Sequence, residues 1–258
     1  MRDNRMKQKL AAGEAVIGTA IGIPDPFVAE LMGDIGFDFL IIDTEHAPLS
    51  DGEVQNLLIA LRPTESTLIV RVQWNDPVRV KRLLDIGAEG IIFPWINSAA
   101  ECRQAVAATK YPPEGIRGYG PRRAARIYPE AGDYADKAND NILVLGQIER
   151  IEAVERLDEI LPTPGFDGVM IGPADLGISM GHLNDLAHPD IDAAIERVLA
   201  KCKQHGVPFG MFTGTLEKAR QWTSRGGQIA TVGGDAGFLE AAARQAKADI
   251  EALKASLG

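Results

Sequence analysis

The sequence predicts a (β/α)8 TIM barrel, with residues 1–258 forming a single domain. Short runs of β-branched and apolar residues alternate with longer segments of helical period, which is the pattern of βα units around a parallel sheet. The short runs are hydrophobic throughout, as expected for strands that are covered on both faces. With 258 residues, 45% of them hydrophobic, the chain has the length of a barrel of about 250 residues.

Eight βα units can be placed along the chain, whereas an open doubly wound sheet normally uses about five or six strands. The expected strands, each bounded by Gly, Pro or Asp, are AVIGTAIG around Ile17, FDFLIID ending at Asp43, TLIVRV ending near Arg71, GIIFPWI around Phe93, NILVLGQIE ending at Glu149, FDGVMIGP ending at Pro173, VPFGMFT ending at Thr213 and GGQIATVGGD ending near Asp235. Segments with an apolar stripe and a charged face predict helices over residues 76–87, 98–110, 150–162, 188–206 and 236–257.

Two connections, residues 111–141 and 175–189, are longer than the roughly two to six residues that are usual between such elements. Loops that follow the strands of a barrel usually hold the substrate. We interpret the first connection as a basic lip for a charged substrate tail, although a solvated loop or a subunit contact fits equally well. Its arginines are Arg117, Arg122, Arg123 and Arg126.

The net charge of −9 and the pI near 5.0 argue against nucleic acid or an anionic membrane as a partner, because neither is attracted to an acidic surface. A small soluble substrate is expected instead. The N-terminus has no apolar segment of signal-peptide length, and no run reaches the roughly 18 apolar residues of a membrane span. We therefore expect a cytoplasmic enzyme. Cys102 and Cys202 lack metal-binding spacing and are expected to be reduced, structural thiols.

The chemistry of a barrel lies at the carboxyl ends of its strands, so polar residues there are the first candidates for an active site. Four expected strands end in such residues. They are Asp43-Thr44-Glu45-His46, Arg71-Val72-Gln73, Gln147-Ile148-Glu149 and Gly172-Pro173-Ala174-Asp175. Convergence from four strands is stronger evidence for a site than any single residue.

Glu149 and Asp175 follow neighbouring strands, and two carboxylates brought together there repel each other unless they share a proton or a cation. Their hard oxygen atoms suit Mg²⁺ or Mn²⁺, which keep coordination positions open for water and for the carboxylate and keto oxygens of a substrate. The alternatives are ion pairs with Arg71 or Arg150, or a carboxylate pair that binds no metal.

Arg71 follows a run of apolar residues, where a guanidinium group needs an anion beside it. It could bind a carboxylate or stabilise the negative oxygen of an enolate, and an internal ion pair with Asp43 or Glu149 is the alternative. His46 lies three residues after Asp43. An aspartate bonded to one imidazole nitrogen would leave the other as a base near neutral pH, although a loop histidine often has no catalytic role.

No expected strand ends in a lysine. The lysines nearest to such a role fall in helices or loops: Lys81, Lys110, Lys201, Lys203 and Lys218. Aldolases that form a Schiff base need a lysine amine in the barrel mouth, so carbon–carbon chemistry here would need a metal to stabilise the carbanion. The small residues from Gly172 to Gly177 could bring backbone N–H groups close to an anion, or could simply form a tight turn.

Five segments together resemble the HpcH/HpaI aldolases, a family of class II pyruvate aldolases, and they occur in that family's order. They are GFDFLIIDTEHAP, VRVQWNDPVRVKRLLDIGAEGIIFP, KYPPEGIRGYGPRRA, QIER and GVMIGPADLGISMG. The resemblance runs nearly end to end. It implies a metal-dependent aldolase, with Mg²⁺, Mn²⁺ or Co²⁺ as cofactor. Such an enzyme reversibly cleaves 4-hydroxy-2-oxo acids to pyruvate, or a close 2-oxo acid, and an aldehyde.

By the same resemblance, Glu149 and Asp175 bind the metal, and Arg71 polarises the keto oxygen and stabilises the enolate. His46, paired with Asp43, handles the proton of the aldol hydroxyl. Further substrate contacts are implied for Gln147, beside the metal, and for backbone groups of Gly172, Ala174 and Asp175. Family members are hexamers built as trimers of dimers, and Asp85 is expected to reach a neighbouring subunit's site.

Two positions near the acceptor pocket depart from the family's best-known member, since Ala20 replaces a tryptophan and Phe212 replaces a leucine. Phe212 is therefore a further candidate for substrate binding. One alternative function is a related lyase that acts on an acyl-CoA or an oxaloacetate-type substrate. Another is a barrel that only binds small molecules, against which the complete set of polar strand ends argues.

Overall fold

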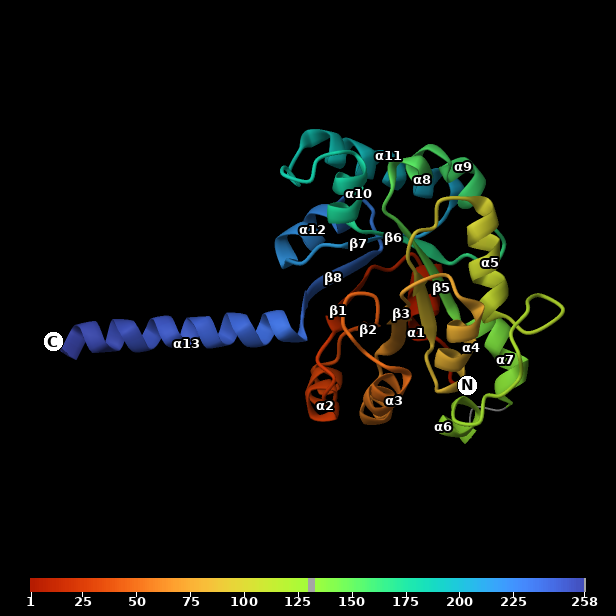
Figure 1. The fold of residues 1–258 in the computed structure, drawn as a ribbon, viewed down its shortest axis with the longest axis horizontal. Coiled ribbons are helices and arrows are strands. Elements are labelled where there is room, and N and C mark those ends of the chain that lie inside the picture. The colour runs from red at the N-terminus through yellow and green to blue at the C-terminus, as the bar shows by residue number, and fades with distance from the viewer. Residues whose placement is uncertain (130–132, 258) are drawn as a thin grey trace.

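The computed structural model describes residues 1–129 and 133–257 and contains a closed barrel of eight parallel strands (Figure 1). The strands are β1 (Val16–Ile21), β2 (Phe39–Asp43), β3 (Thr67–Arg71), β4 (Gly90–Phe93), β5 (Leu143–Ile148), β6 (Gly168–Ile171), β7 (Phe209–Phe212) and β8 (Ile229–Gly234). Each strand pairs with the next and β8 pairs with β1. The predicted TIM barrel is confirmed.

The described helices are α1 (Arg5–Ala11), α2 (Pro26–Ile35), α3 (Asp51–Ala60), α4 (Pro77–Asp85), α5 (Ala99–Thr109), α6 (Ala124–Ile127), α7 (Tyr134–Asn141), α8 (Ile151–Glu155), α9 (Leu157–Ile160), α10 (Pro173–Ser179), α11 (Pro189–His205), α12 (Leu216–Ser224) and α13 (Asp235–Leu257). Local sequence explains many of their ends. An Asp cap followed by proline starts α2 and α4, and Gly206 ends α11 in the left-handed region. The single helix expected over residues 150–162 is two, because Arg156 departs from helical geometry.

Large apolar side chains fill the interior of the barrel, among them Phe39, Ile41, Ile69, Ile92 and Met170. A second apolar layer lies between the strands and the surrounding helices. Cys102 and Cys202 are buried in this outer layer as free thiols, and burial raises their pKa to about 11 and about 12. The expectation of reduced, structural cysteines is confirmed.

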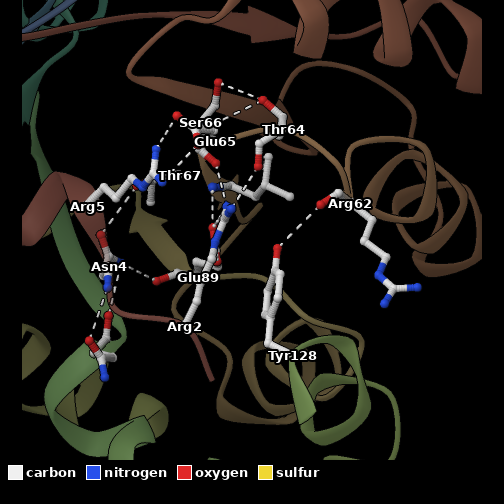
Figure 2. Close-up of polar contacts among 12 residues, drawn as sticks. Arg2, Asn4, Arg5, Arg62, Thr64, Glu65, Ser66, Thr67, Glu89 and Tyr128 are labelled. Atoms are coloured by element: carbon white, nitrogen blue, oxygen red, sulfur yellow. Dashed lines mark hydrogen bonds and ion pairs between the residues drawn. The ribbon is translucent and has the colours of Figure 1, made fainter. Parts of the chain in front are cut away.

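Hydrogen bonds and ion pairs join the N-terminal segment to residues that precede β3 and β4 (Figure 2). Arg2 donates to both carboxylate oxygens of Glu89, at 2.6 and 2.9 Å, and to the carbonyl oxygens of Thr64 and Ser66. Asn4 donates to the carbonyl oxygen of Glu89. Since Glu89 directly precedes β4, these bonds tie the start of the chain to the end of the barrel opposite the candidate site.

The described parts of the connection, residues 111–129 and 133–141, follow α5, so they lie at the amino end of the barrel and not beside the strand ends that carry the chemistry. Arg117 is buried, forms an ion pair with Asp85 at 2.8 Å, and lies over the rings of Tyr111 and Tyr134. Arg123 donates to the carbonyl oxygen of Ile86, just after α4, and to that of Leu58 in α3. The predicted basic lip over this chain's own site is therefore wrong.

Helix α13 leaves the barrel as a straight rod (Figure 1). Its only buried residue among those described is Asp235, whose carboxylate accepts hydrogen bonds from the backbone N–H groups of Gly22 and Ile23. In the part of the chain that the structure describes, no helix combines the length and the apolar character needed to cross a membrane.

Candidate active site

The polar residues predicted at four strand ends converge at the carboxyl end of the barrel. Asp43 and Arg71 are the last residues of β2 and β3 and lie directly opposite each other in the strand register. Glu149 follows β5, and Asp175 lies in the first turn of α10, which starts two residues after β6. The four predicted strand ends thus lie together at the carboxyl end of the barrel.

Glu149 is a buried carboxylate held by two hydrogen bonds. It accepts from the backbone N–H of Trp95 at 2.8 Å and from the side-chain amide of Gln147 at 2.5 Å. Burial, together with the negative charge of Asp175, raises the pKa of Glu149, although the two hydrogen bonds oppose that shift. Removal from water makes its negative charge costly unless a cation or a proton compensates it.

Asp175 and Glu149 face the same small space next to Gly172. A Cβ atom added at Gly172 would lie 3.0 Å from Glu149 Oε2 and 3.4 Å from Asp175 Oδ2, so the two oxygens are no more than about 6.4 Å apart. The side chain of any other residue at position 172 would enter the space between the two carboxylates. Among the described residues, neither carboxylate has an ion pair with arginine, because Arg150 pairs with Glu152 and covers the ring of Trp95.

The donor set of this space fits a hard divalent cation. It offers two carboxylates, and Gln147 adds a buried side-chain oxygen, Oε1, that has no hydrogen-bond partner. Carboxylate and amide oxygens are the ligands that Mg²⁺ and Mn²⁺ prefer. A cation here would offset the repulsion between Glu149 and Asp175 and would keep Glu149 ionised.

Arg71 is held by two acidic residues from the end of β2. Its Nε and one terminal nitrogen donate to Asp43 at 3.0 and 2.7 Å, and its other terminal nitrogen lies 3.2 Å from Glu45. The guanidinium also lies over the ring of Phe212, 5.0 Å from its centre. A guanidinium group has five N–H donors, so these contacts fix its plane and leave donors for a ligand. The ion pair with Asp43 was the alternative considered for Arg71, and the structure contains it.

The imidazole of His46 does not make the hydrogen bond predicted with Asp43. The carboxylate of Asp43 instead accepts from Arg71 and from the backbone N–H groups of Glu45 and His46, at 3.0 and 3.3 Å. Burial would raise the pKa of Asp43, but Arg71 and these N–H groups outweigh it and lower the pKa below its usual value. His46 itself is exposed at the barrel mouth, so its expected pairing is corrected while its place in the site remains.

Glu45 is a member of the site that the sequence analysis did not select. Its side chain is 11% exposed and lies beside Arg71. Burial and the charge of Glu149 raise its pKa to about 7, although the charge of Arg71 opposes the shift. The signal was present in the sequence, because residues two apart in an extended segment point to the same side, and Glu45 follows Asp43 at that spacing.

Trp95 is the second residue that was missed. Its φ of 56° lies in the left-handed region, which a large side chain rarely adopts. This conformation accompanies the hydrogen bond from its backbone N–H to Glu149. Its ring lies 5.9 Å from that of Trp74, and both rings are exposed. The sequence shows two tryptophans after neighbouring strands, but nothing in it reveals the strained backbone.

The predicted substrate contacts around Gly172 and the predicted subunit contact of Asp85 lie at opposite ends of the barrel. Gly172 caps α10 without a side-chain hydrogen bond, so the backbone N–H groups of the first turn, including those of Ala174 and Asp175, have no side-chain cap to satisfy them. Asp85 ends α4 and therefore lies at the amino end of the barrel, paired with Arg117. It is not part of this chain's own set of strand-end residues.

The family model described as HpcH/HpaI aldolase/citrate lyase matches residues 23–242. This chain belongs to that family. A 4-hydroxy-2-oxo-heptane-1,7-dioate aldolase of Escherichia coli is 41% identical over 99% of the chain and 95% of its own length. A 5-keto-4-deoxy-D-glucarate aldolase of Shigella dysenteriae is 38% identical over 94% of both chains.

The fold of the family is the fold of this chain. The crystal structure of a family protein from Burkholderia cenocepacia matches it with a TM-score of 0.91 and 37% identity, covering 96% of this chain and 99% of the other. Aldol cleavage and citrate cleavage both break a carbon–carbon bond. The protein is accordingly an enzyme of the carbon–carbon lyase class, which confirms the resemblance seen in the sequence.

Proposed function

We propose that this protein is a divalent-metal-dependent class II aldolase that cleaves 4-hydroxy-2-oxo acids to pyruvate, or a close 2-oxo acid, and an aldehyde, and that also catalyses the reverse addition. The observation that carries the proposal is the convergence of Glu149 and Asp175 on the space beside Gly172, with Arg71 also in electrostatic reach of Glu149. The names of the two aldolase relatives support the reaction class.

Glu149 and Asp175 would hold the cation, with Gln147 beside them. When bound, a divalent ion supplies a Lewis acid that polarises the substrate's keto oxygen and favours the enolate. Mg²⁺, Mn²⁺ and Co²⁺ are the ions we propose, because oxygen ligands dominate the site. No described strand contains a lysine that could form a Schiff base instead.

Arg71 stabilises the negative charge that develops on the enolate oxygen. Asp43 and Glu45 hold its guanidinium group in one orientation, so little reorganisation is needed when that charge appears. The backbone N–H groups of Ala174 and Asp175, which have no side-chain cap, would bind the substrate carboxylate together with the backbone of Gly172. Phe212, beneath Arg71, and Ala20 on β1 would border the part of the site that takes the aldehyde.

The proton of the aldol hydroxyl is handled at the mouth of the site. His46 is exposed there, and its charge influences the pKa of Glu45. Glu45 has a pKa of about 7, so it holds or releases a proton near neutral pH. Asp43, with its lowered pKa, stays ionised and holds both Arg71 and the backbone of His46.

We further propose that the protein works in the cytoplasm as a homo-oligomer, with the hexamer built as a trimer of dimers. Helix α13 is 23 residues long, hence roughly 35 Å, and it exposes Leu239, Ile250 and Leu253 although almost none of it is buried. Helix α2 exposes Phe27, Leu31 and Ile35 on one face. Apolar helix faces of this size are usually covered by a partner. In such an assembly Asp85 would reach the site of a neighbouring subunit.

The test is pyruvate release from a 4-hydroxy-2-oxo acid by metal-stripped protein, before and after addition of Mg²⁺, Mn²⁺ or Co²⁺. Wild type and Glu152→Ala, an exposed control, should regain activity with metal, and Glu149→Ala should not. Turnover that needs no metal, or none under any condition, would contradict the proposal.

A further inference from the structure

A second group of potential metal ligands lies outside the candidate active site. His182, His188 and Asp190 come from the connection between α10 and α11 and from the first turn of α11. The Oδ2 atom of Asp190 lies 3.8 Å from Nε2 of His182 and 3.6 Å from Nδ1 of His188, and the three donor atoms are within 4.8 Å of one another. The group holds two of the chain's four histidines.

These separations are close to those of a bound transition metal. Zinc lies about 2.0–2.1 Å from imidazole nitrogen and about 2.0–2.2 Å from carboxylate oxygen, so the ligand atoms of a tetrahedral site are roughly 3.4 Å apart. The two nitrogen–oxygen distances therefore need to close by only a few tenths of an ångström. Two imidazoles and one carboxylate are also a common ligand set for zinc that keeps one coordination position open.

The rings must turn for both nitrogens to reach one ion. They are stacked at present, with centres 3.9 Å apart and planes 13° from parallel, whereas an imidazole binds a metal in its own plane. Their side chains are 21% and 33% exposed, so both rings are partly open to solvent and to an incoming ion. The bond from the backbone N–H of Asp190 to His188 Nδ1, at 3.2 Å, would be exchanged for the metal bond.

We propose that His182, His188 and Asp190 form a second metal site that takes a transition-metal ion such as Zn²⁺ and is independent of the Glu149–Asp175 site. Imidazole nitrogen favours Zn²⁺, Ni²⁺ and Cu²⁺ over Mg²⁺, whereas a site with only oxygen ligands accepts the hard ions. The two sites on one chain would therefore take different classes of ion.

An ion at this second site would join the chain just after α10 to the first turn of α11. Helix α10 carries Asp175 and is preceded by Gly172, so the same short helix connects both sites. The backbone between His182 and Asp190 is already joined by hydrogen bonds from Asp185 to His182 and from His188 to Asp185. Metal binding would add a cross-link between the end of α10 and the start of α11.

The experiment counts Zn²⁺ ions bound per chain by isothermal titration of the full-length, metal-stripped protein. The variants are His182→Ala, Glu149→Ala and His205→Ala. His205 is a matched surface histidine, because it also contacts an aspartate, Asp158, at 2.8 Å. The buried thiols of Cys102 and Cys202 offer no competing exposed ligands.

We expect Glu149→Ala and His205→Ala to keep the second site, and His182→Ala to bind Zn²⁺ there at least about tenfold more weakly, since even the loss of a residue that supports a metal ligand costs about 10–100-fold. Mg²⁺ should not compete for it. Identical Zn²⁺ binding by wild type and His182→Ala would overturn the proposal. All variants are compared by Zn²⁺ binding and not by catalytic activity, so the outcome does not depend on whether the protein is an aldolase.

Discussion

The contacts of Arg71 predict that Arg71→Lys loses most of its turnover although it keeps the positive charge. The guanidinium hydrogen-bonds Asp43 through two nitrogens, and its third nitrogen lies 3.2 Å from Glu45 as an ion pair, so this arrangement sets the direction of its remaining donors. A lysine has one nitrogen, which cannot bind both carboxylates and still meet an enolate oxygen in a fixed direction. Loss of one preorganised donor to a developing oxyanion costs about 2.7–4 kcal/mol, so kcat should fall by about 10²–10³.

The assay is steady-state pyruvate release by the metal-loaded enzyme, with kcat and KM determined separately. Arg150→Lys is the control, because Arg150 is at the same end of the barrel but, among the residues that the structure describes, pairs only with Glu152 and the Trp95 ring. We expect its kcat to stay near that of wild type. Near-normal turnover by Arg71→Lys, or an equal loss in both variants, would refute the reasoning.

Three further predictions follow from burial and charge. The pKa of Glu45 is about 7 instead of the ordinary 4.5, so its ionised form disfavours the native state. This penalty is absent below pH 4.5, grows as the pH rises and is complete above pH 7. Urea unfolding of metal-free protein should therefore show wild type losing up to ~3 kcal/mol between pH 5 and 8, and Glu45→Gln losing less. If the unfolding free energies of wild type and Glu45→Gln depended on pH in the same way, Glu45 would be excluded as the cause. Arg2→Ala leaves the carboxylate of Glu89 buried without its partner, so unfolding free energy should drop by about 3–5 kcal/mol, and Arg2→Ala combined with Glu89→Gln should recover part of it. Equal stability of the single and double variants would contradict this. Leu31→Asp places a charge on the exposed face of α2 and should give a smaller assembly by light scattering, whereas an unchanged mass would place the subunit contact elsewhere.

The barrel and most of its strand-end residues could be predicted because they depend on short-range patterns. Buried parallel strands are continuous apolar runs, and the first polar residue after each run lies at the carboxyl end of the barrel. Glu149 follows β5 and Asp175 follows β6, so their proximity follows from strand order alone.

The choice between His46 and Arg71, the two partners considered for Asp43, could not be made in the same way. Sequence proximity favoured His46, three residues away, but the strand register places Arg71 directly opposite Asp43. A guanidinium offers two parallel donors to a carboxylate, so the cross-strand pair forms and His46 contributes its backbone N–H. The raised pKa of Glu45 likewise depends on burial, which a linear sequence does not contain.

The arginine-rich connection was misplaced because only its length and its arginines were considered, and not its position after the helix predicted over residues 98–110. A helix reverses the chain between one strand and the next, so a loop before α5 would lie at the active end and a loop after it lies at the opposite end. Residues 111–141 come after α5 (Ala99–Thr109). Only a subunit packed against that end could bring these arginines to a substrate, so any such role requires the oligomer.

Negative charge is in excess at the carboxyl end of the barrel, so binding of the anionic substrate should depend on prior binding of the cation. Asp43 and Glu45 form ion pairs with Arg71, and Glu149 lies within electrostatic reach of both Arg71 and Asp175, so negative charge is in excess when all four carboxylates are ionised. A 2-oxo acid is itself an anion and would be repelled from such a site. A divalent ion beside Glu149 and Asp175, together with a proton on Glu45, would remove that excess. Affinity for pyruvate should therefore be measurable in metal-loaded protein and nearly absent in metal-stripped protein, and equal affinity in the two forms would contradict this argument.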